Sequence, residues 1–286
     1  MEQVKRRRFG IIASIVLAIL LVAGVAGFAI SAANATKADT LERVKTTGKI
    51  VWGVKTDTKL FGLMNTATGK PEGFDIDIAD AVTKKIGQQI GKELKIEYVP
   101  VTATSKMQLL KNGNIDGTVS TVTITDERKK IIDFTDPYFD AGQAILVKNG
   151  SGIKSVKDLN NKKYTVLAIT GTTAVDTLKE FAPKTRALLV SDYGQAMAAL
   201  KSGQGDAITT DNAILYGLAV QNPGYSVVGG TFTNQPYGIA FDKGQTKMTA
   251  ATNKALKELI ADGTYNKLID KWFGGVKGVN VKELYK

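Results

Sequence analysis

The chain has 286 residues, of which 43% are hydrophobic and 23% charged, a composition typical of a globular protein with room for one large domain or two medium ones. It contains no cysteine and no histidine, so disulfides and thiolate chemistry are excluded and the commonest general base and metal ligand are absent. The formal net charge is +11, but the lysines are interspersed with Asp and Glu, which favours a solvated basic surface over a nucleic-acid interface.

The N-terminus has the organisation of an export signal. The basic run Lys5–Arg8 precedes an uncharged apolar segment from Phe9 to Ile30, and Ala33-Asn34-Ala35 supplies the small residues that signal peptidase requires. We expect residues 1–35 to be either a signal peptide cleaved after Ala35 or an uncleaved N-terminal membrane anchor, because the apolar segment is long enough to span a bilayer. In both cases the remaining chain is extracytoplasmic, secreted or held at the outer face of the membrane, and residues 36–40 form a tether.

The remaining chain alternates short apolar runs with segments of helical periodicity. The runs with strand character are residues 50–54, 94–99, 117–123, 144–147, 164–169 and 207–209. Helical periodicity is found near residues 74–82, 107–112, 174–181 and 195–201, and in a final pair of segments between Met248 and Trp272, separated at Gly263. This alternation predicts an α/β protein with two lobes, each a mostly parallel sheet flanked by helices.

Seven short motifs follow one another along this body. They are Gly73-Phe74-Asp75-Ile76-Asp77-Ile78, Thr121-Val122-Thr123-Ile124-Thr125-Asp126-Glu127-Arg128, Asp133-Phe134-Thr135-Asp136-Pro137-Tyr138, Gly171-Thr172-Thr173, Gly205-Asp206-Ala207 leading to Asp211, Tyr237-Gly238-Ile239-Ala240-Phe241, and Gly263-Thr264-Tyr265 with Lys271-Trp272-Phe273-Gly274. In this order they resemble the polar amino-acid (glutamine/glutamate-type) branch of the bacterial extracellular solute-binding proteins that serve ABC importers. The resemblance covers about residues 41–276.

The resemblance implies a two-lobe, periplasmic-binding-protein-like fold of type II, with hinge crossings near residues 137–142 and 233–237. The chain would then divide into lobe 1 (residues 41–138 and 236–276), lobe 2 (residues 139–235) and a C-terminal tail (residues 277–286). A monomer of this kind captures a polar amino acid in the cleft between the lobes, where strand ends and helix N-termini converge. It delivers the amino acid to a membrane permease whose ATPase is a separate subunit.

An amino-acid ligand brings a carboxylate and an ammonium that must both be paired when water is excluded. The guanidinium of Arg128, after a Thr-rich turn, fits a carboxylate with two hydrogen bonds. The resemblance assigns the α-carboxylate to Arg128, with help from Thr123, and includes Thr121 of the same motif among the ligand-binding residues. It assigns the α-ammonium to Asp211, whose position before a predicted helix also suits an N-cap.

Further ligand contacts follow from two other segments. Thr172 and Thr173 belong to a strand-to-helix turn whose free backbone amides suit a carboxylate. Phe61 is matched to an aromatic residue that covers the ligand in the family, although one extra residue before it makes Leu60 an equal candidate.

The ligand's side chain is the least determined feature. Lys55 and Lys106 fall where binders of glutamate and aspartate carry arginines, whereas Asp57 matches an aspartate that contacts the side-chain amide in glutamine binders. A carboxylate at Asp57 would repel an acidic ligand unless a lysine neutralised it. The charges therefore allow glutamate, aspartate, glutamine or asparagine, with the acidic pair slightly favoured.

Other kinds of site are not supported by the motifs. Asp75, Asp77 and Asp80 lack the Gly and terminal Glu of a calcium loop, and acids at a helix start complement the helix dipole. The segment from Gly62 to Lys70 lacks the Ser or Thr of a phosphate loop, since Pro71 follows the lysine. We expect no metal, no cofactor and no nucleic-acid partner.

Two alternative functions remain open: an amino-acid sensing module without transport, and a dehydratase-like enzyme on the same fold. Without histidine or cysteine, only Lys, Asp, Glu or Tyr remains to supply an acid or base in such an enzyme, and no surplus pair of these residues is found near the motifs.

Overall fold

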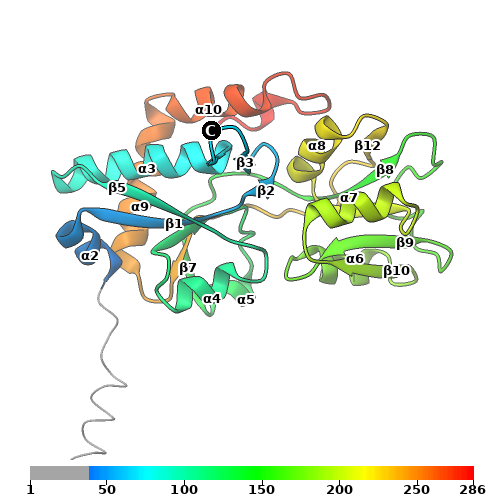
Figure 1. Cartoon of the computed structure of the whole chain (residues 1–286), viewed down its shortest axis with the longest axis horizontal. Coiled ribbons are helices and arrows are strands. Elements are labelled where there is room, and N and C mark those ends of the chain that lie inside the picture. The colour runs from blue at the N-terminus through cyan, green and yellow to red at the C-terminus, as the bar shows by residue number, and fades with distance from the viewer. Residues whose placement is uncertain (1–38) are drawn as a thin grey trace, which may run out of the picture. The chain divides into compact units, whose positions relative to one another are not determined.

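Two five-stranded sheets dominate residues 39–286, the part of the chain that this computed structural model describes (Figure 1). The expected signal peptide or anchor, residues 1–35, lies outside the described residues. Within residues 39–286 no helix has both the length and the apolar character needed to cross a membrane.

The first sheet has the strand order β5-β1-β6-β13-β7. Its strands are β1 (Lys49–Val54), β5 (Lys95–Pro100), β6 (Gly117–Val119), β7 (Ile132–Phe134) and β13 (Ala240–Asp242). Strand β1 pairs in parallel with β5 and β6, whereas β13 pairs antiparallel with β6 and β7. The helices that accompany it in the chain are α2 (Thr40–Thr47), α3 (Phe74–Ile90), α4 (Lys106–Lys111), α5 (Asp126–Lys129), α9 (Thr246–Ala261) and α10 (Thr264–Phe273).

The second sheet has the order β10-β9-β11-β8-β12 and repeats this arrangement. Its strands are β8 (Gln143–Lys148), β9 (Thr165–Ile169), β10 (Arg186–Val190), β11 (Ala207–Asp211) and β12 (Tyr225–Val228), and its helices are α6 (Ala174–Phe181), α7 (Tyr193–Lys201) and α8 (Asn212–Gln221). Again a single strand, β8, runs against the others. The prediction of two mostly parallel sheets flanked by helices is confirmed, and the reversed strand is in each case the one that follows a connection between the sheets.

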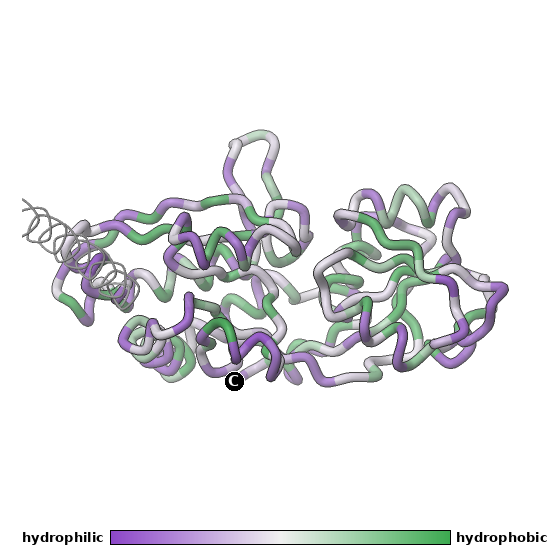
Figure 2. Tube along the Cα trace, turned by 90° about the horizontal axis from the view of Figure 1, so that it is seen from below, coloured by the Kyte–Doolittle hydropathy of each residue, from purple (hydrophilic) through white to green (hydrophobic). Residues whose placement is uncertain are grey.

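The burial of their apolar side chains explains why these segments form strands and helices. Every residue of β11 is buried, as are all but the last of β8, as expected for central strands covered on both faces. Figure 2 shows hydrophobic stretches along the strands and hydrophilic residues in many of the connections. Helix α3 runs eight residues beyond its expected end at Val82 because its apolar spacing continues to Ile86, and Gly91 ends it in a left-handed conformation (φ 68°).

A third, small sheet was not expected from the sequence. It consists of β2 (Asp57–Thr58), β3 (Gly62–Asn65) and β4 (Lys70–Glu72), paired antiparallel. The strands are too short to show a period of two, so the sequence indicated only an interruption and a turn. This sheet places Phe61, just before β3, in the interior next to Gly73, where a side chain would meet the Phe61 carbonyl at 2.0 Å.

The two connections between the sheets lie against each other as an antiparallel pair. Tyr237 donates its amide to the carbonyl of Phe139 (2.8 Å), and Gln235 donates to Ala141 (2.7 Å). At Gly142 the approach is so close that a Cβ atom would lie 2.2 Å from the Thr233 carbonyl oxygen. The two crossings therefore form one hydrogen-bonded ribbon.

Both ends of the described chain are tied to the fold. Asp39 caps α2 by accepting from the Leu41 amide (2.9 Å), and the Thr40 amide donates to Gln245 (2.6 Å). Residues 39 and 40 are thus part of the folded body, which corrects their expected place in a tether, because an aspartate at this position supplies a helix cap. At the other end, the Lys286 ammonium lies 3.0 Å from a carboxylate oxygen of Asp140 in the first crossing.

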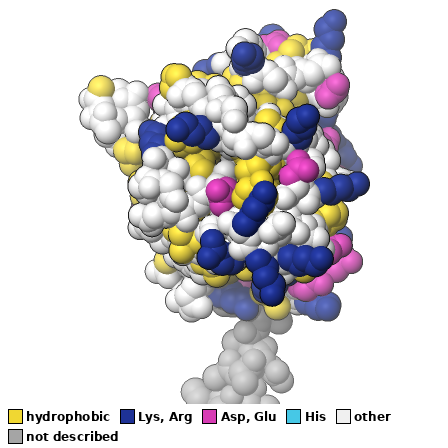
Figure 3. Space-filling view, turned by 90° about the vertical axis from the view of Figure 1, so that its right-hand side faces the viewer, with side chains coloured by type: hydrophobic (Ala, Val, Ile, Leu, Met, Phe, Trp, Pro, Cys, Tyr) yellow, Lys and Arg dark blue, Asp and Glu magenta, His cyan; other side chains and the backbone are white. Residues whose placement is uncertain are grey.

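Surface charge is spread rather than gathered. Figure 3 shows Lys and Arg side chains distributed over one face, with Asp and Glu between them. Several are in exposed ion pairs, such as Lys179 with Asp176 (2.9 Å). This distribution agrees with the solvated basic surface expected from the sequence.

The ribbon's packing gives a test of stability. Gly142→Ala is expected to lower the unfolding free energy by about 1–3 kcal/mol, since its new methyl group must displace the Thr233 backbone. Urea unfolding measures the change.

The matched control is Gly194→Ala in α7, whose Cβ would meet only a side-chain oxygen of Asp192, at 3.2 Å. It should leave stability unchanged or raise it through helix propensity. Equal effects of the two substitutions would contradict the close packing of the crossings.

Candidate functional site

A pocket lies where the carboxyl ends of strands from both large sheets meet. Its lining includes eight residues predicted from the sequence, Lys55, Lys106, Thr121, Thr123, Arg128, Thr172, Thr173 and Asp211, together with Ala103, Gly171, Tyr193, Thr210 and Ile214. Lys55 follows β1, Thr121 follows β6 and Asp211 ends β11. Parallel pairing brings these strand ends to one edge of each sheet, which is where ligands bind in open α/β folds.

Arg128 lies in α5 with its guanidinium free of carboxylates. The hydroxyl of Thr125 caps this helix by accepting from the Arg128 amide (3.2 Å). One guanidinium nitrogen donates to the Thr123 carbonyl (2.8 Å), and within residues 39–286 no ion pair is formed. Burial lowers the pKa of Arg128, against the opposing effect of Asp211. The remaining N–H donors are available to a ligand anion.

Asp211 is buried at the opposite side of the pocket. Although it occupies the N-cap position of α8, its side chain makes no capping hydrogen bond. One carboxylate oxygen accepts from Gln143 Nε2 (2.6 Å) and the other from the hydroxyl of Tyr237 (2.6 Å). Burial raises the pKa of Asp211 to about 6, against the lowering effects of these hydrogen bonds and of Lys106 and Arg128. The pocket therefore contains the buried carboxylate of Asp211 and the half-buried guanidinium of Arg128, with no ion-pair partner for either among the described residues.

The model of the bacterial extracellular solute-binding proteins, family 3, matches residues 50–275. The chain belongs to this family. It is 50% identical over 241 residues to the ABC transporter glutamine-binding protein GlnH of Bacillus subtilis (strain 168), covering 84% of this chain and 87% of that protein. It is 51% identical over 205 residues to a glutamine-binding protein of Geobacillus stearothermophilus, covering 72% and 77%.

The fold is similar to that of solved amino-acid-binding proteins. An ancestral arginine-binding protein bound to glutamine superposes with a TM-score of 0.73 at 41% identity, covering 79% of this chain and 98% of that one. The expected membership of the solute-binding family and the two-lobe fold are thereby confirmed.

In this solute-binding protein, side chains from both crossings hold the pocket's polar groups. Gln235, from the second crossing, accepts from the hydroxyls of Thr173 (2.5 Å) and Thr123 (3.4 Å), which belong to opposite sides of the pocket. Gln143, the first residue of β8 directly after the first crossing, donates to Asp211, while its Oε1 is buried without a hydrogen-bond partner among the described residues. Neither glutamine was predicted, because an isolated Gln in a loop carries no pattern that indicates a role.

The two lysines of the solute-binding protein's pocket have different partners. The Lys55 ammonium forms an ion pair with Asp57 (2.8 Å) and lies 5.7 Å from the centre of the Tyr193 ring. Lys106 donates to the Ser120 carbonyl (2.9 Å). Burial lowers the pKa of Lys106, and the positive charges of Arg128 and Lys55 add to that effect. Asp57 does not line the pocket and acts on it through Lys55.

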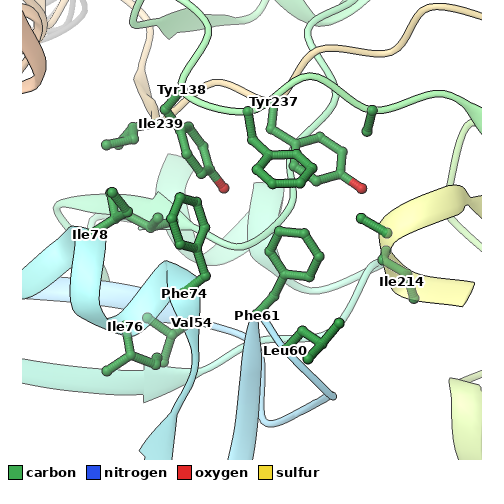
Figure 4. Close-up of a cluster of buried hydrophobic side chains, with 14 of the residues drawn as sticks. Val54, Leu60, Phe61, Phe74, Ile76, Ile78, Tyr138, Ile214, Tyr237 and Ile239 are labelled. Atoms are coloured by element: carbon green, nitrogen blue, oxygen red, sulfur yellow. The ribbon is translucent and has the colours of Figure 1, made fainter. Parts of the chain in front are cut away.

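The structure places Phe61 in the core rather than in the pocket. Its ring is fully buried in an aromatic cluster, 5.1 Å from the ring centre of Phe139 and 5.7 Å from that of Tyr237, and it does not line the pocket (Figure 4). Leu60 does not line it either. The aromatic residue of the pocket is Tyr193, at the start of α7. The sequence predicted this helix only from residue 195, whereas it begins at Tyr193, with Asp192 capping it by accepting from the Gln195 amide (2.8 Å).

The buried carboxyl of Asp211 gives a test whose expected size differs between two pH values. The pKa of Asp211 is about 6 in the folded protein, against 3.8 for a free carboxyl, so ionising this group costs stability. The folded protein is free of this cost below pH 3.8, and the cost is complete once the pH has risen through 6. The full cost is about 3 kcal/mol of unfolding free energy. Asp211→Asn should therefore raise the melting temperature of the ligand-free protein at pH 8 by several degrees, and much less at pH 4.5.

Asp176→Asn, at an exposed side chain of α6, serves as the control and should leave both melting temperatures near wild type. A variant at Asp211 that is destabilised more at pH 8 than at pH 4.5 would show that the ionised carboxylate supports the fold.

Proposed function

We propose that this solute-binding protein captures a polar amino acid, preferably glutamine, outside the cytoplasm and delivers it to the permease of an ABC importer that has a separate ATPase subunit. The observation that carries the proposal is a pocket in which Arg128 and Asp211 are both free of ion-pair partners within residues 39–286. A zwitterionic amino acid supplies both missing charges, a carboxylate for the guanidinium and an ammonium for the carboxylate.

We propose glutamine as the ligand, in place of the acidic amino acid that the sequence slightly favoured. Lys55, one of the two lysines behind that preference, is already neutralised by Asp57. The relatives at 50% and 51% identity are named for glutamine, which supports an amide side chain. Thr121, Thr123, Thr172 and Thr173 supply hydroxyl and backbone groups around such a ligand.

The proposal includes closure of two lobes. Lobe 1 comprises residues 41–138 and 236–276, lobe 2 residues 139–235, and the paired crossings act as the hinge. The first and second sheets fall within these ranges. The two sides of the pocket approach closely, since a Cβ atom on Gly171 would lie 2.9 Å from a methyl carbon of Thr104, which is the contact expected of a closed form.

Export follows from the N-terminal sequence, with residues 1–35 as signal peptide or anchor. The protein acts as a monomer without cofactor and catalyses no reaction. Its pocket holds no histidine or cysteine, and its carboxylate Asp211 already accepts two hydrogen bonds, which leaves it suited to holding a cation.

Charge removal in the pocket should abolish tight binding. Arg128→Ala or Asp211→Ala leaves one ligand charge buried without a partner, at a cost of about 2–5 kcal/mol. The dissociation constant for glutamine, measured by isothermal titration calorimetry, should rise roughly 30-fold to several thousand-fold.

Lys129→Ala is the matched control, because Lys129 is exposed next to Arg128 and, among residues 39–286, its ammonium pairs with the exposed Asp126. Equal affinities of the Arg128 and Lys129 variants would show that the carboxylate is bound elsewhere.

Closure itself is measurable in solution. Saturating glutamine should reduce the radius of gyration in small-angle scattering, because the ligand bridges residues of both lobes. The Arg128→Ala protein at the same glutamine concentration should keep the ligand-free value. A wild-type radius that does not change at saturation would argue against hinged closure.

A further inference from the structure

One peptide group beside the pocket lies between a buried cation and a buried anion. The carbonyl of Ser120 accepts from the Lys106 ammonium (2.9 Å), and the amide of the next residue, Thr121, donates to Asp75 Oδ2 (2.9 Å). Thr121 has φ 49°, a left-handed conformation unusual for a residue with a side chain, so the orientation of this peptide is imposed by its surroundings. Lys106 and Thr121 line the pocket, whereas Asp75 lies behind them.

Asp75 is fully buried in the first turn of α3. Its other oxygen accepts from the hydroxyl of Tyr138 (2.7 Å) in the first crossing, seen among the labelled side chains of Figure 4. Tyr138 is held in turn by Tyr265 of α10, which donates to its carbonyl (2.6 Å). Among the described residues, Lys106 of α4 is the charged group that acts on this carboxyl. Asp75 and Lys106 thus form a charge pair joined through one peptide.

The charges around the pocket can be matched one by one. Lys55 is paired with Asp57, and a bound amino acid would pair its carboxylate with Arg128 and its ammonium with Asp211. When the pair of Asp75 and Lys106 carries no net charge, a ligand with a neutral side chain leaves the occupied pocket electrically neutral. When the pair takes up one proton it becomes positive, and an anionic ligand side chain then restores neutrality.

We infer that Asp75 and Lys106, coupled through the Ser120–Thr121 peptide, switch the pocket between amide and acidic amino acids by taking up one proton. This inference rests on the proposed function and adds a regulatory property to the same site. Low pH favours a ligand with a side-chain carboxylate, and high pH favours the amide.

The switch lies near neutral pH. Burial raises the pKa of Asp75 to about 7, against the lowering effects of its hydrogen bonds from Tyr138 and Thr121 and of the Lys106 charge. The side chain of free glutamate is ionised throughout this range. Glutamine and glutamate present the same α-carboxylate and α-ammonium, so titration of Asp211 affects both alike and cancels in the ratio of their affinities.

The experiment measures dissociation constants of glutamine and glutamate by calorimetry between pH 6 and pH 8.5. From pH 8.5 to pH 6, the dissociation constant of glutamate divided by that of glutamine should fall at least about tenfold. A change of this size is expected when one proton is taken up together with glutamate. Repeating the glutamate titration at pH 7.5 in buffers of different ionisation enthalpy should reveal net proton uptake, which glutamine binding lacks.

Variants separate this role from a merely structural one. Asp75→Asn keeps an oxygen for the Thr121 amide and an NH₂ group for the Tyr138 hydroxyl, and should give a ratio nearly independent of pH that favours glutamate. Tyr138→Phe removes a donor to the carboxylate and should move the change in ratio to higher pH. Asp77→Asn is the matched control on the same helix, since Asp77 bonds to Lys271 and Trp272, and it should behave as wild type.

A wild-type ratio that does not vary with pH, without proton uptake, would overturn the switch while leaving the proposed function intact, provided that glutamine binds and Arg128→Ala abolishes binding. Failure of both amino acids to bind the wild-type protein would overturn the proposed function and the switch together.

Discussion

The backbone pairing of the two crossings is the constraint on which the rest of the structure depends. Hydrogen bonds between Phe139 and Tyr237 and between Ala141 and Gln235 hold the two crossings together. The same segments supply Tyr138, which bonds to Asp75, and Gln143 and Tyr237, which bond to Asp211. Any bending of the ribbon therefore changes the surroundings of the pocket's charges, so that motion and recognition share one set of contacts.

The aromatic cluster beneath the ribbon gives it a rigid base. Phe61, Phe74, Phe139 and Phe273 pack edge to face or tilted, with ring centres 5.1–6.3 Å apart. Phe139 and Tyr237 belong to both the ribbon and the cluster, and their rings stack at 5.7 Å. Rigid packing on one side and a polar pocket on the other leave the crossings few ways to move, as hinged closure requires.

The sequence predicted those strands, helices and pocket residues that are marked by local periodicity or by a motif. The central strands β8 and β9 and helix α6 lie within about a residue of their expected positions, because continuous burial or helical spacing marks them. Arg128, Asp211 and the threonines line the pocket because their motifs end strands that meet at one edge. Tyr193, Gln143 and Gln235 were missed because tertiary contacts alone bring them to the site. Phe61 lies in the core rather than in the pocket, because an aromatic side chain next to a turn can pack in a core as well as against a ligand.

The position of β13 in the first sheet has a consequence for how the chain folds. It lies between β6 and β7, yet it is about a hundred residues later in the sequence than either. The second sheet is contiguous, from β8 to β12, and all its strands are available before β13 has been synthesised. Completing the first sheet thus requires a contact of high sequence separation, which is slow to form and leaves β6 and β7 without their shared neighbour until then. A chain delayed in this way stays unfolded longer, which would suit the export proposed from its N-terminal sequence.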